Sequence, residues 1–335
     1  MNKQTSKKVI FNQTGNADVF EIIDVNIANP QANEVQIQVH AIGLNRAEIM
    51  YRNGQYVIDP VFPAQLGYEA AGVVLAVGEN VRDVSVGDKV AVVPSFMFTE
   101  YGTYGEIVNL PAHAIVKFPD NVNFVQAAAS YMQYVTAYGA LVEFGKLKQG
   151  DVVLINAAAS SVGIAAIQIA NMVGAVPVAV IRSSSKKQAL LDAGATHIIT
   201  DEDDLLAEVD KISGGRGVNI VFDPVGGANA ATFAKAMAMQ GVYFLYGALD
   251  YANLQIGVMD ILAKHLTFRG YELFEITTDM QALEHAKTFV NQGLASGKLS
   301  PVIDREFDFA DIADAHRYME AGSQVGKIVV KVQAA

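Results

Sequence analysis

The feature that most constrains this chain is the run between Asp151 and Arg182, which contains no charged side chain. It exceeds the ~20 apolar residues that a transmembrane helix needs. Its periodicity changes along its length, however, because VVLIN and AVPVAVI are typical of strands, AAASSVG of a turn and IAAIQIANMVG of a helix. Parallel strands covered on both faces are apolar throughout. The run therefore predicts a buried β-α-β unit and not a membrane span.

The rest of the chain divides into a β-rich part and a part in which strands alternate with helices. Before residue 128, short runs such as EVQIQVHAIGLN, AAGVVLAVG and KVAVVPS predict a partly barrel-like antiparallel domain. After it, repeated strand–helix units predict a doubly wound parallel sheet of the Rossmann type. We therefore expect an α/β protein in which residues 1–127 form a β-barrel catalytic domain. Residues 128–267 would form an inserted dinucleotide-binding domain, and residues 268–335 a return segment that completes the first domain.

The composition excludes several classes of function. The chain of 335 residues has 24 Lys and Arg against 35 Asp and Glu, a formal net charge of -11, which argues against a nucleic-acid partner. It has no cysteine, which excludes disulfides, thiolate zinc sites, iron–sulfur clusters and a cysteine nucleophile. The basic N-terminus leads into no apolar segment, so we read no signal peptide and expect a cytoplasmic protein without a membrane partner.

The turn inside the uncharged run is a candidate pyrophosphate site. Ala158, Ser160 and Gly163 stand where the dinucleotide fingerprint has its three glycines. Small residues allow backbone N–H groups to approach a pyrophosphate at the positive end of a helix. We therefore expect Ser160, Ser161, Val162 and Gly163 to bind the cofactor. The alternative is an ordinary tight turn of an α/β protein.

The end of the next strand indicates which cofactor would bind. An acidic residue there suits the ribose 2′-hydroxyl of NAD, whereas an arginine suits the 2′-phosphate of NADP. Arg182 follows the strand directly, with Ser183 and Lys186 beyond it and no acidic residue before Asp192. Because a guanidinium matches phosphate geometry, the sequence predicts NADPH as cofactor. A basic, solvated loop is the alternative interpretation.

Several long motifs give the chain a family resemblance. They include GLNRAEIMYRNGQY, PAQLGYEAAGVVLAVGENVRDVSVGDKVAV, NIVFDPVGG and VGKIVV. With them the chain resembles the zinc-free branch of the medium-chain dehydrogenase/reductase superfamily that includes the zeta-crystallin-like quinone oxidoreductases. The resemblance implies a GroES-like β domain with an inserted Rossmann domain. It also implies a homodimer or homotetramer, which we expect to associate through a sheet edge near YFLYGAL.

The positions of the metal ligands set the chain apart from its zinc-dependent relatives. Zinc-dependent alcohol dehydrogenases of the superfamily carry Cys where Asn45 stands and His where Tyr68 stands. Without these ligands the catalytic zinc has no coordination shell. The six histidines are scattered, and we interpret each as a surface or strand-end imidazole. We predict no metal site.

The resemblance also implies roles for individual residues. Asn45 is expected near the nicotinamide or its ribose, Thr136 near the carboxamide, and Tyr246, Gly247 and Lys327 on the cofactor side. Candidate hydrogen-bond donors or stacking rings for the acceptor are Tyr51, Tyr56 and Tyr104. Each of these tyrosines has an alternative interpretation as a packed ring with a satisfied hydroxyl.

These observations favour an NADPH-dependent reductase that transfers hydride to quinones or α,β-unsaturated carbonyl compounds. Such electron-poor acceptors need hydrogen-bond donors for a developing oxyanion and no Lewis-acidic zinc. The alternatives are an enoyl-thioester reductase, an alcohol dehydrogenase-like oxidoreductase and a non-catalytic, crystallin-like protein that binds NADPH.

Overall fold

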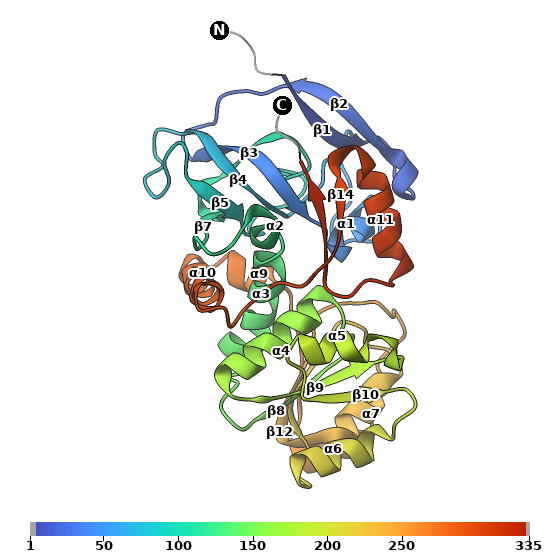
Figure 1. Ribbon diagram of the computed structural model, residues 1–335. Helices are drawn as coiled ribbons and strands as arrows, with labels where there is room; N and C mark the ends of the chain where they lie inside the picture. The colour runs from blue at the N-terminus through green and yellow to red at the C-terminus, as the bar shows by residue number, and fades with distance from the viewer. Residues whose placement is uncertain (1–4, 333–335) are drawn as a thin grey trace. The chain divides into compact units, whose positions relative to one another are not determined.

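A computed structural model describes residues 5–332 and divides them into two units, which are described separately here. Within these residues the first unit contains 5–132, 287–295 and 303–332, and the second contains 133–286 and 296–302. Most of the first unit therefore comes from the two ends of the described chain, as the blue and red colours of Figure 1 show, while residues 287–295 lie between two segments of the second unit.

The first unit is built on a seven-stranded sheet centred on β3. The sheet has the order β14-β15-β3-β4-β5-β7, with β6 paired to β3 as well, and β1 and β2 form a separate antiparallel pair. Only the β14–β15 pair is parallel among the pairings of this sheet that the structure describes. The strands are β1 Thr5–Phe11, β2 Phe20–Asn26, β3 Glu34–Gly43, β4 Glu69–Val77, β5 Lys89–Val92, β6 Ile107–Pro111, β7 Ile115–Lys117, β14 Ile303–Asp308 and β15 Lys327–Lys331.

The helices of this unit are α1 Arg46–Arg52, α2 Phe124–Ala127 and α11 Ile312–Ala321, and α10 Met280–Ala295 is shared, with residues 287–295 in the first unit and 280–286 in the second. Helix α1 begins at Asn45, where a capping box pairs Asn45 with Glu48. Helix α11 ends at Gly322, whose φ of 71° is the left-handed conformation that glycine adopts without strain. The start of α1 and the end of α11 are thus each set by a local feature, a capping box and a glycine.

The second unit is a six-stranded parallel sheet of order β10-β9-β8-β11-β12-β13. In chain order this is 3-2-1-4-5-6, so the direction of winding reverses between β8 and β11. The strands are β8 Val152–Ile155, β9 Val176–Ile181, β10 His197–Thr200, β11 Val218–Asp223, β12 Met237–Leu245 and β13 Thr267–Gly270. The helices are α3 Tyr131–Tyr138, α4 Ser161–Val173, α5 Lys187–Asp192, α6 Leu205–Ser213, α7 Asn229–Ala236, α8 Val258–Lys264 and α9 Phe274–Thr277.

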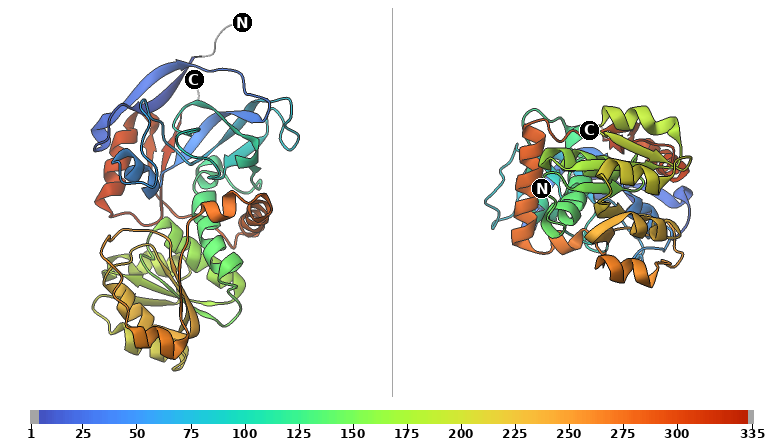
Figure 2. Two further views of the ribbon diagram at one scale, coloured as in Figure 1. Left: turned by 180° about the vertical axis from the view of Figure 1, so that it is seen from behind. Right: turned by 90° about the horizontal axis from the view of Figure 1, so that it is seen from below.

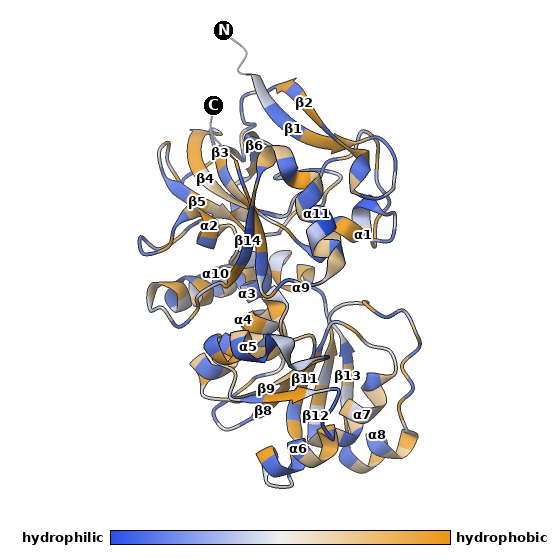
Figure 3. Ribbon diagram, turned by 45° about the vertical axis from the view of Figure 1, so that its right-hand side comes forward, coloured by the Kyte–Doolittle hydropathy of each residue, from blue (hydrophilic) through white to orange (hydrophobic). Residues whose placement is uncertain are grey.

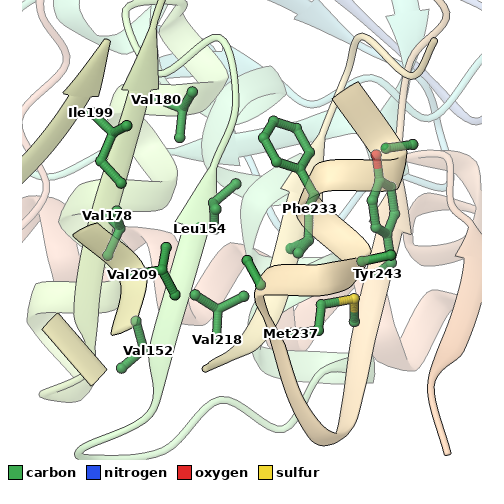
Figure 4. Close-up of a cluster of buried hydrophobic side chains, with 14 of the residues drawn as sticks. Val152, Leu154, Val178, Val180, Ile199, Val209, Val218, Phe233, Met237 and Tyr243 are labelled. Atoms are coloured by element: carbon green, nitrogen blue, oxygen red, sulfur yellow. The ribbon is translucent and has the colours of Figure 1, made fainter. Parts of the chain in front are cut away.

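The core of the second unit explains the uncharged run. Its segments form β8, the turn, α4 and β9, which confirms the predicted β-α-β unit. Helices α4 and α5 cover one face of the sheet and α6 and α7 the other (Figure 1). On the α7 side, Leu154, Val180, Phe233 and Tyr243 belong to one buried cluster (Figure 4). Hydrophobic colouring accordingly runs along β9 in Figure 3. Within residues 5–332, no helix is long and apolar enough to cross a membrane.

Two expectations about the end of this sheet need correction. Strand β13 pairs with β12 in the parallel sheet, so residues 268–286 lie in the second unit and not in a return segment that starts at 268. Strand β12, which contains YFL, pairs on both sides and is not the edge expected for self-association; that edge is β13. The sequence indicates a strand at LTFRGYE, but its partner is set by backbone pairing with β12, which the side chains do not reveal. The left view of Figure 2 shows this twisted sheet from behind.

Candidate functional site

The turn between β8 and α4 has the shape that a dinucleotide fingerprint requires. Ser160 caps α4, accepting a hydrogen bond from the backbone N–H of Gly163 at 3.0 Å. A Cβ on Gly163 would lie 2.6 Å from the carbonyl oxygen of Ala158, so only glycine allows this close packing. Ala157 adopts the left-handed conformation, with φ of 49°. The turn thus directs the N-terminus of α4, with Ser161 and Val162 in its first turn, to the carboxyl edge of the sheet.

A buried carboxylate ties this turn to the next strand of the sheet. Asp223, at the end of β11, accepts hydrogen bonds at 2.8 Å from the Asn156 side chain and the Val225 backbone, and at 3.0 Å from Gly226. The hydroxyl of Tyr243 also donates to it. Asn156 directly follows β8. Asp223 therefore fixes the two loops that flank the point where the sheet reverses its winding, which is where ligands bind in open α/β sheets.

The predicted 2′-phosphate residues lie at the carboxyl end of β9. Arg182 is exposed, and no ion pair within residues 5–332 engages its guanidinium. The Ser183 and Ser185 hydroxyls are 2.8 Å apart. Lys186 is half-buried at the start of α5. An exposed guanidinium next to two hydroxyls is a donor set that fits a phosphate group.

The remaining predicted cofactor residues of this unit are less exposed. Tyr246 follows β12 and stacks on Phe222 with ring centroids 3.9 Å apart. A Cβ on Gly247 would lie 2.7 Å from the carbonyl oxygen of Pro224, so the ends of β11 and β12 approach closely. Thr136 is buried in α3. The structure thus brings Tyr246 and Gly247 to the same sheet edge as the β8–α4 turn.

Lys327 and Asn45 lie together in the first unit, in a buried charged group. The Lys327 ammonium is 2.6 Å from both the Glu69 carboxylate and the Asn45 side-chain oxygen. Burial raises the pKa of Glu69, and the charge of Lys327 opposes that effect. A Cβ on Gly43 would meet the carbonyl oxygen of Ala128 at 2.0 Å, so glycine is required beside this pair. Lys327 is therefore engaged by a carboxylate rather than free.

The other groups of Asn45 bind a second buried carboxylate. Its backbone N–H donates to Glu48 at 2.7 Å, and its side-chain amide donates to Glu48 at 3.3 Å and to the Gly43 carbonyl at 3.1 Å. Glu48 also accepts from the Tyr68 backbone at 3.2 Å and from the Tyr104 hydroxyl at 2.7 Å. Burial raises the pKa of Glu48 to about 7, although the hydrogen bonds from Tyr104 and Asn45 lower it. Hydrogen bonds thus hold both the oxygen and the nitrogen of the Asn45 side-chain amide.

Tyr104 links Glu48 to a buried histidine. The Tyr104 hydroxyl is 2.9 Å from Nε2 of His316, and Nδ1 of His316 is 3.0 Å from the Arg52 guanidinium. Because arginine only donates, Nδ1 must accept, so the proton of the neutral imidazole lies on Nε2 and is donated to Tyr104. Burial, followed by the charge of Arg52, lowers the pKa of His316. Arg52 in turn pairs with Glu320.

This arrangement differs from two expectations. His316 is fully buried in α11 and is neither a surface nor a strand-end imidazole. The hydroxyl of Tyr104 is occupied by Glu48 and His316, which matches the packed-ring interpretation of that tyrosine. Sequence reasoning missed Glu48, Arg52 and His316. The only local signal was the Asn45-x-x-Glu48 spacing of a capping box.

The other two predicted tyrosines belong to an aromatic cluster in the first unit. Tyr51 is buried, with its ring 4.8 Å from Phe98 and 5.9 Å from Phe11. Tyr56 is half-buried, and its ring lies 5.9 Å from that of Phe98. The structure thus brings Tyr51 and Tyr56 together in this cluster. The hydroxyl of Tyr104 takes part instead in the hydrogen bonds described above. Across the described part of the chain, no three His, Asp or Glu side chains are grouped so as to hold a metal ion.

A 3-2-1-4-5-6 parallel sheet with a small-residue turn before α4 defines a dinucleotide-binding unit, here joined to a β-rich unit. Residues 31–120 match the alcohol dehydrogenase GroES-like domain, and residues 161–299 match the zinc-binding dehydrogenase family. The quinone oxidoreductase of Salmonella typhimurium is 30% identical over 328 residues, which cover 95% of this chain and 97% of that protein. The chain belongs to the medium-chain dehydrogenase/reductase superfamily.

Two further comparisons agree with this assignment. The synaptic vesicle membrane protein VAT-1 homolog of Rattus norvegicus is 32% identical over 318 residues, covering 90% of this chain and 77% of that protein. The crystal structure of Escherichia coli quinone oxidoreductase complexed with NADPH matches with a TM-score of 0.87 and 27% identity, covering 97% of this chain and 99% of that one. The predicted fold class, a GroES-like domain with a Rossmann sheet, is confirmed.

Proposed function

We propose that this oxidoreductase uses NADPH to reduce quinones or α,β-unsaturated carbonyl compounds without a metal ion. The observation that carries the choice of cofactor is Arg182, exposed and free of ion pairs within residues 5–332, at the carboxyl end of β9. Its position next to Ser183 and Ser185 suits the 2′-phosphate that distinguishes NADPH from NADH. The complex of the Escherichia coli relative with NADPH supports the same choice.

The geometry of the second unit supports cofactor binding by the chain's own residues. The N-terminus of α4 offers backbone N–H groups and a positive dipole end to a pyrophosphate, and Gly163 keeps that helix close to β8. Bound NADPH supplies a hydride, which carries both electrons of the reduction. The remaining proton comes from solvent, so the products are NADP⁺ and a hydroquinone or a saturated carbonyl compound.

The first unit supports the metal-free part of the proposal. At the positions of the zinc ligands, Asn45 and Tyr68 offer an amide and a phenol, and the Asn45 amide is held by Glu48 and Lys327. Electron-poor acceptors suit such a site because they need hydrogen-bond donors for the developing oxyanion. Tyr56, which is half-buried, remains the best-placed donor among the predicted tyrosines.

The test compares oxidation of NADPH and NADH at 340 nm with 1,4-benzoquinone and with a simple enone. We expect NADPH-preferring turnover that a chelator does not change. In Arg182→Ala, the KM for NADPH should rise by on the order of tenfold or more, because a charge-assisted phosphate contact is lost. The KM for NADH should change little.

Arg216→Ala is the matched control. Arg216 is an exposed arginine of the same unit that lies before β11, at the opposite end of the strands, so its loss should leave both KM values unchanged. Equal effects of Arg182→Ala on both cofactors would contradict the 2′-phosphate assignment.

Other outcomes would favour the alternative functions. Turnover of an enoyl thioester alone would favour an enoyl-thioester reductase, and oxidation of an alcohol alone would favour an alcohol dehydrogenase-like enzyme. NADPH binding without turnover of any substrate would favour the non-catalytic alternative. The cytoplasmic location stays a prediction.

A further inference from the structure

A chain of buried hydrogen bonds in the first unit leads from Arg52 to Asn45. The Arg52 guanidinium is 3.0 Å from Nδ1 of His316, and Nε2 of His316 is 2.9 Å from the Tyr104 hydroxyl. Tyr104 donates to Glu48 at 2.7 Å, and Glu48 also accepts from the backbone and the side-chain amide of Asn45. Of these five buried residues, Asn45 is the most exposed, at 8%. The chain is therefore held by protein groups and not by solvent.

The hydrogen bonds of this chain can point in one direction only. Arginine has no acceptor, so Nδ1 of His316 accepts and Nε2 carries the proton of the neutral ring. Tyr104 accepts the hydrogen bond from Nε2 and must therefore turn its own O–H toward Glu48. The opposite tautomer would place a second hydrogen between Nδ1 and the guanidinium. Arg52 thus fixes the direction of the Tyr104 hydroxyl, two hydrogen bonds away.

The same reasoning fixes the orientation of the Asn45 amide. Lys327 has only donors, so the amide oxygen must face its ammonium group, at 2.6 Å. The amide nitrogen then faces two acceptors, Glu48 at 3.3 Å and the Gly43 carbonyl at 3.1 Å. Glu48 receives the amide only through an oxygen that accepts, and a donor such as Tyr104 favours the ionised carboxylate. The orientation of Asn45 therefore depends on Tyr104 and on the groups that orient its hydroxyl.

Stability alone does not account for this chain. Replacing buried ionic groups by apolar residues of similar volume is often neutral for the free energy of unfolding, whereas a fully satisfied polar network specifies one geometry. We infer that His316 and Tyr104 are positioning residues, which act through Glu48 to hold the Asn45 amide in the orientation that the reaction requires. The inference rests on the proposed function, in which Asn45 stands at the position of a zinc ligand.

Two substitutions of His316 separate the hydrogen bond from packing. The nitrogen of glutamine takes the place of Nε2, so His316→Gln keeps a donor to Tyr104. The amide of asparagine reaches only the place of Nδ1, so His316→Asn keeps a partner for Arg52 alone. At pH 8, where Glu48 with its pKa of about 7 is ionised, we expect His316→Asn to lower kcat with 1,4-benzoquinone about tenfold at an unchanged KM. His316→Gln should stay within about threefold of the wild type.

A double variant tests whether His316 acts through Tyr104. Tyr104→Phe keeps the ring but removes the donor to Glu48, so its kcat should also fall about tenfold. Because the two residues act in series, Tyr104→Phe combined with His316→Asn should lose no more than Tyr104→Phe alone. Losses that multiply to about a hundredfold would show two independent effects and overturn the inference. A wild-type kcat in Tyr104→Phe would overturn it as well.

Tyr318→Phe is the matched control. Tyr318 lies in α11, the helix that carries His316, and its hydroxyl donates to the Asp304 carboxylate at 2.8 Å. The substitution removes the same kind of hydrogen bond outside the chain and should leave kcat unchanged. A tenfold loss there would attribute the effects to loosening of α11 and reject the inference. Melting curves identify any variant that fails to fold, and if His316→Asn does, Tyr104→Phe still decides.

Hydrogen exchange of the Asn45 side-chain amide separates this inference from the proposed function, because it needs no acceptor. NMR of protein labelled with nitrogen-15 in asparagine detects these protons, and Asn45→Asp assigns their signal by its loss. We expect exchange at least about tenfold faster in Tyr104→Phe and His316→Asn, and unchanged in His316→Gln and Tyr318→Phe. If the wild type reduces no acceptor but exchange follows this pattern, the proposed function fails and the positioning of Asn45 stands. Unchanged exchange in Tyr104→Phe rejects the positioning even if the enzyme is active.

Discussion

At the scale of single residues, Glu48 is a fully buried carboxyl group that titrates near neutral pH. Burial raises its pKa from 4.5 to about 7. Between these values the folded protein binds more protons than the unfolded chain, so the free energy of unfolding falls as pH rises and levels off above pH 7. The expected loss from this group is about 3 kcal/mol. Urea unfolding at pH 5 and pH 8 measures it.

The comparison of two variants isolates this group from the other carboxyls. Glu48→Gln should lose this share of the pH dependence whatever its absolute stability, because no proton binds at that site. Glu79→Gln, which changes an exposed residue of the same unit, should keep the slope of the wild type. An identical slope in Glu48→Gln and wild type would show that Glu48 does not titrate in this range.

The same residues show where sequence reasoning ends. Glu48 and Asn45 are three positions apart, and a capping box can be read from that spacing. Tyr104 and His316 are 212 positions apart, and their contact arises only when β14, α11 and β15 join the first unit. No local pattern marks a histidine as buried when all of its partners are distant in sequence, so His316 resembles a surface imidazole until the fold is known.

At the scale of elements, the turn before α4 depends on one glycine. An added Cβ on Gly163 would meet three backbone atoms of Ala158 within 2.7 Å, so α4 would have to move away from β8. We expect Gly163→Ala to weaken NADPH binding by on the order of a hundredfold, because displaced N–H groups no longer converge on the pyrophosphate. A fluorescence titration with NADPH measures this effect.

Gly270→Ala is the control for that substitution. Gly270 lies in β13 of the same unit, and an added Cβ there would have no atom within 4 Å. Its affinity for NADPH should equal that of the wild type. Wild-type affinity in Gly163→Ala would mean that the turn tolerates displacement and is not the pyrophosphate site.

The elements that sequence reasoning predicted share one physical property. Strands β8 and β9 and helix α4 are apolar, largely buried and adjacent in the chain, so their hydrophobic pattern indicates their burial directly. Strand β13 has four residues, two of them exposed, and its place depends on backbone pairing with β12. Backbone pairing leaves no signature in side chains, which is why the boundary at residue 268 was misplaced.

At the scale of the whole molecule, one of the two end strands of the parallel sheet is where we expect the predicted self-association. Strand β13 is the edge, and nearby α8 exposes Val258, Met259 and Leu262 by 68%, 69% and 61%. Edge strands pair readily with a second copy, and a twofold axis would bring two α8 helices together. We expect light scattering to give at least twice the chain mass of 35.8 kDa. The substitution Leu262→Glu should lower the measured mass, because it would bury a charge in that contact.

Val86→Glu is the control for self-association, since Val86 is an equally exposed apolar residue, at 65%, in the first unit. It should leave the measured mass unchanged. A wild type that has the mass of a single chain would reject the predicted homodimer. A Leu262→Glu variant that keeps the wild-type mass would instead place the interface elsewhere.

The position of β15 between β14 and β3 has a consequence for how the protein is made. The ribosome releases residues 5–132 first, but their sheet gains β14 and β15 only after residue 303 has emerged. Until then Glu69 lacks Lys327, and Tyr104 lacks His316. The second unit, whose strands all lie between residues 152 and 270, emerges complete before that point. We therefore expect the nucleotide-binding unit to fold first during translation. The N-terminal part of the nascent chain is synthesised earlier but can complete its sheet only when β14 and β15 have emerged.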